Sequence, residues 1–170
     1  MHKVFFELGD DISTDIIYPG RYMATVLPTE TPQYAFADIK ELNRMLVKGE
    51  VTKGSVLVAR KNFGCGSSRE QAVSTLKGHE ITIVAKNFAR IFIQNSVNLG
   101  LNTIECPDIE ASVGDELEIT ETKVINETTG KVFDIIPHPP ARRAIINAGG
   151  LIAYTKKLLL EKSGLKAVIL

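Results

Sequence analysis

The residues with the clearest chemical potential form one short segment, Gly64-Cys65-Gly66-Ser67-Ser68-Arg69-Glu70. Its two glycines let the backbone adopt positive φ angles and approach a ligand closely. Arg69 carries a planar, permanently charged guanidinium that matches a carboxylate. Ser67 and Glu70 have the spacing of a capping box at the start of a helix, where free backbone amides attract an anion. The segment therefore predicts an anion site, and spacing alone equally supports a simple turn followed by a helix cap.

Side chains that bind metals are few in this chain. It has two cysteines, Cys65 and Cys106, and three scattered histidines, His2, His79 and His138. Their spacing matches neither a zinc site nor an iron–sulfur site. Cys65 is predicted to be a small packing residue in the tight turn, and Cys106 to lie at a buried strand end. Any metal must therefore come from another protein, and the unpaired thiols favour a reducing compartment.

The elements around the segment are predicted from apolar runs, helical spacing and turn residues. The first half is expected to form parallel β-α-β units, with strands at 4–8, 55–60, 81–85 and 103–105 and helices at 37–48, 67–77 and 89–98. The second half is expected to form an antiparallel hairpin from strands at 116–120, 123–126 and 131–135, then helices at 141–148 and 151–162. We therefore predict an α/β fold with a mixed parallel and antiparallel sheet, or a partly open barrel, flanked by helices.

Composition limits the domain count and the kinds of partner. The 170 residues, 44% of them apolar, fit one domain that spans 1–170. The 20 basic residues balance 20 acidic ones, which argues against nucleic acid or an anionic membrane as a partner. No apolar run is long enough to span a bilayer, and the N-terminus lacks a secretory signal. We expect a soluble, cytoplasmic protein.

Two longer runs, 61–70 and 85–92, resemble the small subunit of 3-isopropylmalate dehydratase and the last, swivelling domain of aconitases. Three further stretches are also similar, at 9–15, 95–101 and 148–152. The resemblance therefore spans nearly the whole chain. One departure is Gln71, where many relatives have histidine; it leaves the subfamily open.

The resemblance implies a hydro-lyase that removes water from a malate-type substrate and adds it back at the neighbouring carbon. Ser67 would be the general base, working as an alkoxide, and Arg69 would bind a substrate carboxylate. Ser68 and Gly66 would belong to the same substrate pocket. The family's [4Fe-4S] cluster is held by three cysteines of a large subunit, so a heterodimer or heterotetramer with that subunit is implied, with no metal ligand in this chain.

By the same resemblance, the loop Arg21, Tyr22, Met23, Ala24 and Thr25 lies where two-subunit members select the substrate side chain. Homoaconitase-like members place an arginine, which binds an extra carboxylate, where this chain has Ala24. An unpaired buried carboxylate is costly, whereas Met23 and Ala24 can contact methyl or isopropyl groups. The loop therefore favours a small dicarboxylic alkylmalate over citrate or homocitrate. In the alternative, Met23 packs into the core and Arg21 is solvated, or Arg21 itself reaches a substrate carboxylate.

Other polar residues near these segments are expected to have structural roles. Asp10 and Asp15 are predicted to cap the first turn rather than to act in catalysis. Lys86, Arg90 and Asn95 are predicted to position a subunit interface or their own helix.

The leading hypothesis is a subunit that interconverts 2-isopropylmalate and 3-isopropylmalate through 2-isopropylmaleate, in leucine biosynthesis. A related subunit, of a 2,3-dimethylmalate or methylmalate-type dehydratase or of a homoaconitase, is the alternative. A stand-alone module that binds anions or RNA is the non-enzymatic alternative, and the neutral charge argues against RNA. The sequence leaves open the true substrate, the stoichiometry, self-association and the effect of Gln71.

Overall fold

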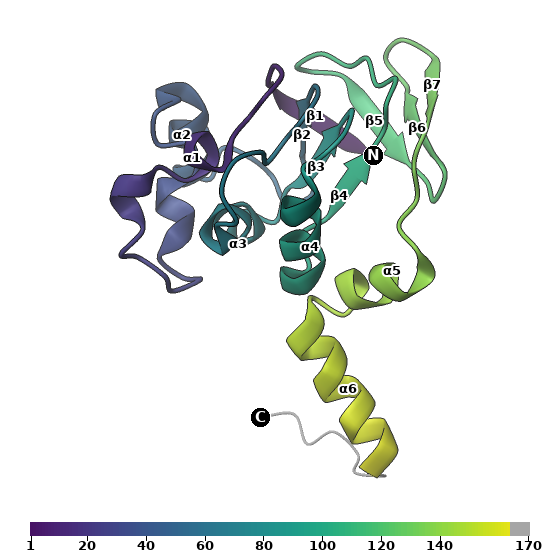
Figure 1. The fold of residues 1–170 in the computed structure, drawn as a ribbon. Coiled ribbons are helices and arrows are strands. Elements are labelled where there is room, and N and C mark those ends of the chain that lie inside the picture. The colour runs from purple at the N-terminus through teal and green to yellow at the C-terminus, as the bar shows by residue number, and fades with distance from the viewer. Residues whose placement is uncertain (164–170) are drawn as a thin grey trace.

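The structure, a computed structural model, describes residues 1–163. Its strands are β1 (His2–Glu7), β2 (Val56–Ala59), β3 (Thr82–Ala85), β4 (Thr103–Glu105), β5 (Glu116–Ile119), β6 (Lys123–Asn126) and β7 (Lys131–Asp134). They form one sheet in the order β4-β3-β2-β1-β5-β6-β7 (Figure 1). The pairs among β1 to β4 are parallel, and the pairs from β1 through β5 and β6 to β7 are antiparallel. The predicted mixed sheet is therefore confirmed.

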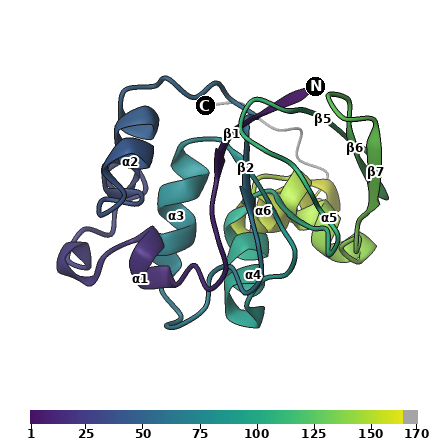
Figure 2. The ribbon, with the colours of Figure 1, turned by 90° about the horizontal axis from the view of Figure 1, so that it is seen from above.

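Helices surround this sheet unevenly. They are α1 (Thr14–Ile17), η1 (Gly20–Tyr22), η2 (Thr31–Tyr34), α2 (Lys40–Val47), α3 (Glu70–Gly78), α4 (Arg90–Leu99), α5 (Pro140–Asn147) and α6 (Leu151–Ser163). Seen from above, α2 and α3 lie on one side of β1 and β2, and β5 to β7 lie on the other (Figure 2). The parallel strands are thus covered on both faces, by helices and by the antiparallel strands.

The residues of β2 explain this double cover. All four are buried, and alternate side chains point to opposite faces of a strand. Leu57 and Ala59 belong to the core cluster under the helices, whereas Val56 and Val58 belong to a second cluster that includes Leu117 of β5. The sheet therefore curls into a half-barrel with one core on each side of its parallel strands.

The antiparallel half consists of the three predicted strands, with β5 paired to β6 and β6 paired to β7. Between β6 and β7, the buried Asn126 side chain accepts hydrogen bonds from the backbone N–H groups of Thr128 and Thr129, at 3.1 and 3.2 Å. These bonds satisfy a buried amide oxygen and close the predicted turn.

Two stretches that carried the family resemblance meet at the end of α4. A Cβ on Gly100 would lie 2.4 Å from the backbone carbon of Gly149, and one on Gly150 would lie 2.7 Å from the Asn98 oxygen. Only glycine permits this close approach of two backbones. The contact holds α5 and the start of α6 against α4, and α6 then projects away from the sheet (Figure 1).

Candidate active site

Three loops meet at the edge of the sheet where parallel strands β1, β2 and β3 end, the usual place for a ligand site in such sheets. The Gly64 N–H donates to the Ile12 oxygen at 2.7 Å, and the Thr14 N–H donates to the Cys65 oxygen at 2.8 Å. On the other side, the Ala89 N–H donates to the Phe63 oxygen at 2.9 Å. The turn after β2 is therefore joined by backbone hydrogen bonds to the loops on both sides.

The backbone of Gly64 fits this turn because it lacks a side chain. Its φ is +79°, and a Cβ placed there would lie 2.2 Å from Cγ of Phe92. The Phe92 ring in turn packs edge-on against Phe63, with 5.3 Å between ring centroids. The turn therefore rests directly on aromatic side chains, as the predicted need for glycine requires.

Ser67 lies exposed on the turn and bonds to a residue that the sequence analysis did not single out. The Ser67 Oγ is 3.1 Å from Thr14 Oγ1, and Thr14 Oγ1 also donates to the Ser67 carbonyl oxygen at 3.2 Å. The predicted capping box is wrong: α3 begins at Glu70, its N-cap is Arg69, and no side chain caps it. Contact with Thr14 keeps Ser67 outside the helix, so the expected start at Ser67 is three residues early.

Arg69 is the other predicted catalytic residue, and its side chain is only 18% exposed. Its guanidinium forms an ion pair with Asp15 and donates to the Tyr18 carbonyl oxygen at 3.3 Å. The prediction that Asp15 caps the first turn is wrong, because Ser13 is the N-cap of α1 and its side chain accepts from the Ile16 N–H. Asp15 instead holds Arg69 against α1.

The prediction that Asp10 caps the first turn is also wrong, because Ser13 is the N-cap of α1. The Asp10 carboxylate accepts from the backbone N–H of Lys61 at 2.8 Å, so it joins the loops after β1 and β2. Asn95 of α4 donates to the Ser68 carbonyl oxygen at 3.2 Å. Ser68 and Gly66 are both exposed on the turn. The positioning role predicted for Asn95 therefore applies to the turn itself.

The loop at 21–25 begins with the single turn η1 and is fixed by aromatic contacts. The Tyr22 ring stacks on Tyr34 with 4.2 Å between centroids. The buried Tyr18 hydroxyl lies 3.1 Å from the carbonyl oxygens of both Tyr22 and Thr25. Met23 is 36% exposed and Ala24 is exposed, so the alternative that Met23 packs into the core is wrong.

Arg21 lies on the protein surface, where half of its side chain is exposed and where it pairs with an acidic residue. Its guanidinium bonds both carboxylate oxygens of Asp38, at 2.5 and 3.0 Å, and stacks over the ring of Tyr22. The guanidinium lowers the pKa of the Asp38 carboxyl. The positive charge of Arg21 is therefore already matched by a carboxylate of the same chain.

The turn and the loop lie side by side. A Cβ on Gly20, which precedes the loop, would lie 3.6 Å from the Asp15 carboxylate and 3.8 Å from the Arg69 guanidinium. Beyond the loop, a cavity of about 250 Å³ lies between residues 26–28 and α3. It is lined by Val26, Pro28, Glu70, Gln71, Ser74 and Leu99. Gln71, the departure from the family pattern, thus lines this cavity.

In the part of the chain that the structure describes, no three histidine, cysteine, aspartate or glutamate side chains gather as a metal site requires. Cys65 and Cys106 are both free thiols, and burial raises the pKa of the Cys106 thiol to about 11. An iron–sulfur cluster therefore has no ligand set among residues 1–163, and none of its chemistry is assigned to this chain.

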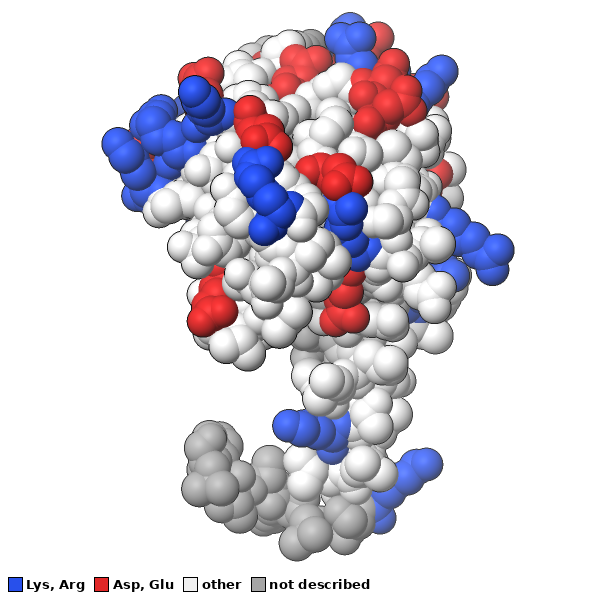
Figure 3. All heavy atoms as spheres, turned by 60° about the vertical axis from the view of Figure 1, so that its left-hand side comes forward, with Lys and Arg blue, Asp and Glu red and all other residues white. Residues whose placement is uncertain are grey.

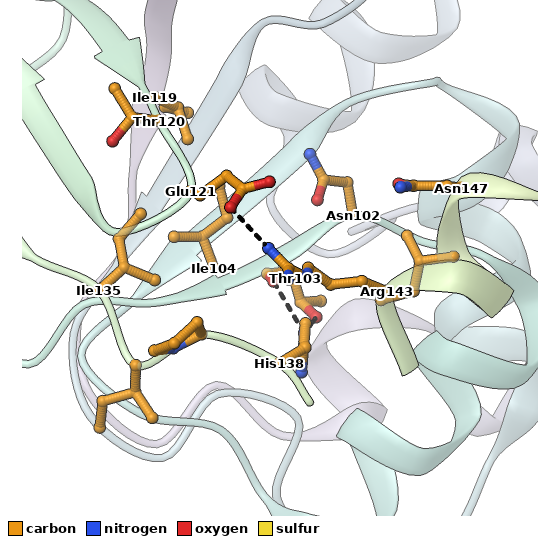
Figure 4. Close-up of a pocket in the computed structure, with 13 residues that line it drawn as sticks. Asn102, Thr103, Ile104, Ile119, Thr120, Glu121, Ile135, His138, Arg143 and Asn147 are labelled. Atoms are coloured by element: carbon orange, nitrogen blue, oxygen red, sulfur yellow. Dashed lines mark hydrogen bonds and ion pairs between the residues drawn. The ribbon is translucent and has the colours of Figure 1, made fainter. Parts of the chain in front are cut away.

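A separate cavity of about 430 Å³ lies between the antiparallel strands and α5 (Figure 4). Arg143 and Glu121 pair across it at 3.1 Å, and the His138 ring nitrogen lies 3.1 Å from the Thr103 oxygen. Burial lowers the pKa of His138. The lining of this cavity, all within residues 102–147, includes none of the residues predicted for the site.

The described surface has no obvious single-sign field on the face drawn in Figure 3. There, basic side chains lie next to acidic ones, with broad uncharged areas between them. Among residues 1–163, no helix combines the length and the apolar composition needed to cross a lipid bilayer.

Sequence reasoning found the turn and the loop but missed the residues that hold them. Ser67 is contacted by Thr14, the loop backbone by Tyr18, and Arg21 by Asp38. Thr14 did lie within a stretch that resembled the family, residues 9–15, and this was the available signal for it.

Comparisons with known proteins show which family the sequence matches. Residues 19–109, which include both the loop and the turn, match the aconitase C-terminal domain family. The chain is 42% identical to the 3-isopropylmalate dehydratase small subunit of Methanosarcina mazei over 92% of this chain and 97% of that protein. It is 44% identical to the small subunit of Caldicellulosiruptor bescii over 91% and 92%.

A solved structure has the same fold over nearly the whole chain. The crystal structure of 3-isopropylmalate dehydratase from Methanocaldococcus jannaschii superimposes with a TM-score of 0.85 and 37% identity, over 95% of this chain and 96% of that one. The resemblance and the fold class inferred from the sequence are confirmed. The chain therefore belongs to the aconitase C-terminal domain family and, within it, to the 3-isopropylmalate dehydratase small subunits.

Proposed function

We propose that this chain, with a larger cluster-bearing subunit, interconverts 2-isopropylmalate and 3-isopropylmalate through 2-isopropylmaleate. The observation that carries the proposal is the adjacency of an exposed serine, a partly buried arginine and a loop with exposed Met23 and Ala24 at one edge of the sheet. The relatives of this chain are named for 3-isopropylmalate. One domain, 1–170, supplies this half of the site.

Ser67 acts as the general base in this proposal. Its Oγ accepts the proton from the substrate carbon next to a carboxylate, and the electron pair of that C–H bond forms the new double bond as the hydroxyl group leaves. A serine hydroxyl is too weak an acid to ionise at neutral pH without strong local stabilisation. Hydrogen-bond donors around Ser67, in a site closed to water by the large subunit, supply that stabilisation.

Arg69 binds a substrate carboxylate, with Ser68 and the backbone at Gly66 in the same pocket. Asp15 and the Tyr18 carbonyl oxygen hold the Arg69 guanidinium, and 18% of the Arg69 side chain stays exposed and available to a substrate. Holding the carboxylate here directs the neighbouring C–H bond towards Ser67.

The loop selects the isopropyl group. Met23 and Ala24 offer exposed apolar contacts, with Tyr22 and Thr25 fixing the loop around them. Neither exposed position carries a charge that could pair with a third carboxylate of a substrate. A citrate-type or homocitrate-type substrate would leave that carboxylate beside Ala24 without a partner.

The partner is the large subunit, in a heterodimer or a heterotetramer. It would hold the [4Fe-4S] cluster, which would supply a Lewis acid for the leaving hydroxyl group; residues 1–163 offer no ligand set for it. Two free thiols suit the reducing cytoplasm as the location.

The proposal is tested by reconstituting the chain anaerobically with a large subunit from the same organism. Ultraviolet absorbance of the unsaturated acid is followed with isopropylmalate, dimethylmalate, methylmalate, citrate and homocitrate. We expect the highest kcat/KM with isopropylmalate. A higher value with dimethylmalate would replace the substrate, and no activity with any alkylmalate would overturn the enzymatic role.

A further inference from the structure

One short helix contacts both proposed catalytic residues. α1 places Thr14 against Ser67 and the next residue, Asp15, against Arg69. Thr14 is only 2% exposed, and its backbone is fixed by the bond from its N–H to Cys65 and by the bond from the Tyr18 N–H to its carbonyl oxygen. A buried hydroxyl is thus held at a fixed position beside the exposed Ser67 hydroxyl.

The hydrogen atoms of these two hydroxyls can be counted. Thr14 Oγ1 has one hydrogen and two neighbours within bonding distance, the Ser67 carbonyl oxygen at 3.2 Å and Ser67 Oγ at 3.1 Å. When Thr14 donates to the carbonyl oxygen, its lone pairs are left to accept the Ser67 hydroxyl hydrogen. When Ser67 is an alkoxide, only the opposite arrangement is possible, with Thr14 donating to Ser67 Oγ.

We propose that Thr14 is a positioning residue for Ser67, and that its hydroxyl turns from the Ser67 carbonyl to Ser67 Oγ when Ser67 loses its proton. The inference rests on the proposed role of Ser67 as the base. Donation to an ionised oxygen is stronger than donation to a neutral carbonyl, so this rotation of the Thr14 hydroxyl stabilises the alkoxide. After Ser67 takes the substrate proton, the Thr14 hydrogen returns to the carbonyl.

The surroundings allow this small rotation without moving the backbone. Threonine is β-branched, which restricts its side chain and fixes the place of the oxygen while leaving the hydrogen free to turn. A Cβ on Gly66 would lie 3.5 Å from Thr14 Oγ1, an ordinary contact, so the turn leaves room beside the hydroxyl.

The test compares Thr14→Val, which keeps the shape and removes the hydroxyl, with Thr14→Ser, which restores a hydroxyl. The matched control is Thr31→Val, since Thr31 is fully buried and its Oγ1 lies 3.0 Å from the hydroxyl of Ser74, away from the turn. All are assayed as complexes with the large subunit on isopropylmalate, beside Ser67→Ala. Substrate deuterated at the carbon that loses its proton gives the isotope effect.

We expect Thr14→Val to lower kcat by about 10- to 100-fold, the effect of one hydrogen bond to a charged group. KM should change little, the isotope effect on kcat should rise because proton removal becomes slower, and Thr14→Ser should recover most of the activity. Thr31→Val should keep the wild-type kcat.

Other outcomes separate this inference from the proposed function. If Ser67→Ala abolishes turnover while Thr14→Val keeps wild-type kcat, the inference is overturned and the role of Ser67 stands. An equal loss in Thr31→Val, or no recovery in Thr14→Ser, makes the effect one of folding and also overturns it. If Ser67→Ala remains fully active, the role of Ser67 fails first. Should Thr14→Val not assemble, Thr14→Ala provides the same comparison.

Discussion

The turn at 64–69 and the loop at 21–25 are neighbours that are held in different ways. Backbone hydrogen bonds to both flanking loops fix the turn, and Gly64 has no space for a side chain. The loop is fixed by a ring stack, by the Tyr18 hydroxyl and by a surface ion pair, and it leaves Met23 and Ala24 exposed. Under the proposed function this difference separates two tasks. Proton transfer takes place on the rigid turn, and substrate selection on the loop, which tolerates substitution.

The largest effect is expected from Ser67→Ala in the turn. Loss of a general base should lower kcat by about 10³-fold, while assembly with the large subunit persists because Ser67 is exposed and outside the core. Turnover of the reconstituted complex and its elution volume measure the two properties. Ser112→Ala, a change at an exposed serine before β5, is the control. Turnover within tenfold of wild type would remove Ser67 from the mechanism.

The rigidity of the turn is tested by Gly64→Ala. The positive φ and the contact with Phe92 should together destabilise the fold by about 3 kcal/mol, measured by urea unfolding. Gly9→Ala is the control, since a Cβ there would meet nothing within 4 Å. Similar stabilities for the two variants would show that the turn adapts to a side chain.

The loop is tested by Ala24→Arg, which should leave stability nearly unchanged because Ala24 is exposed. We expect the ratio of kcat/KM for homocitrate to that for isopropylmalate to rise by about 10-fold or more. Thr29→Arg adds the same charge farther along the chain and should not change this ratio. An equal response to both substitutions would remove Ala24 as the selecting position.

The smallest effect is expected from Asp38→Asn, which breaks the exposed pair with Arg21. The pKa of Asp38 is lowered in the folded protein, so the pair stabilises above the ordinary pKa of 3.8 and this contribution is lost as the pH falls through the folded-state value. At pH 7 the thermal midpoint should fall only slightly, since exposed pairs contribute little. The difference from wild type should vanish at low pH; a large difference at both pH values would contradict a surface role.

Much of this fold could be predicted because β2 and β3 are buried over their whole length and α4 ends at a left-handed glycine, Gly100. β4 has the predicted bounds, and β2 lies within the predicted run at 55–60. The predicted start of α3 was wrong because Ser67 is kept out of the helix by Thr14, which lies 53 residues before it in the sequence. Local spacing contains no information about such a contact.

The candidate site was predictable in part for the same reason. Glycine, serine and arginine in the turn indicate an anion site by their chemistry, and resemblance supplied their roles. The partners Asp15 of Arg69 and Asp38 of Arg21 could not be found from spacing, because each pair forms only after the chain has folded. Asp15 has the side chain of a helix cap, but the neighbouring Ser13 takes that place.

The hydrogen bonds that join the three loops at the sheet edge also matter for assembly. A flexible segment that becomes ordered on binding costs conformational entropy at each association. Here the bonds to Ile12, Cys65 and Phe63 are already made in the isolated subunit. In the proposed complex the large subunit therefore meets a preorganised surface, and its affinity is not reduced by the need to order Ser67 and Arg69.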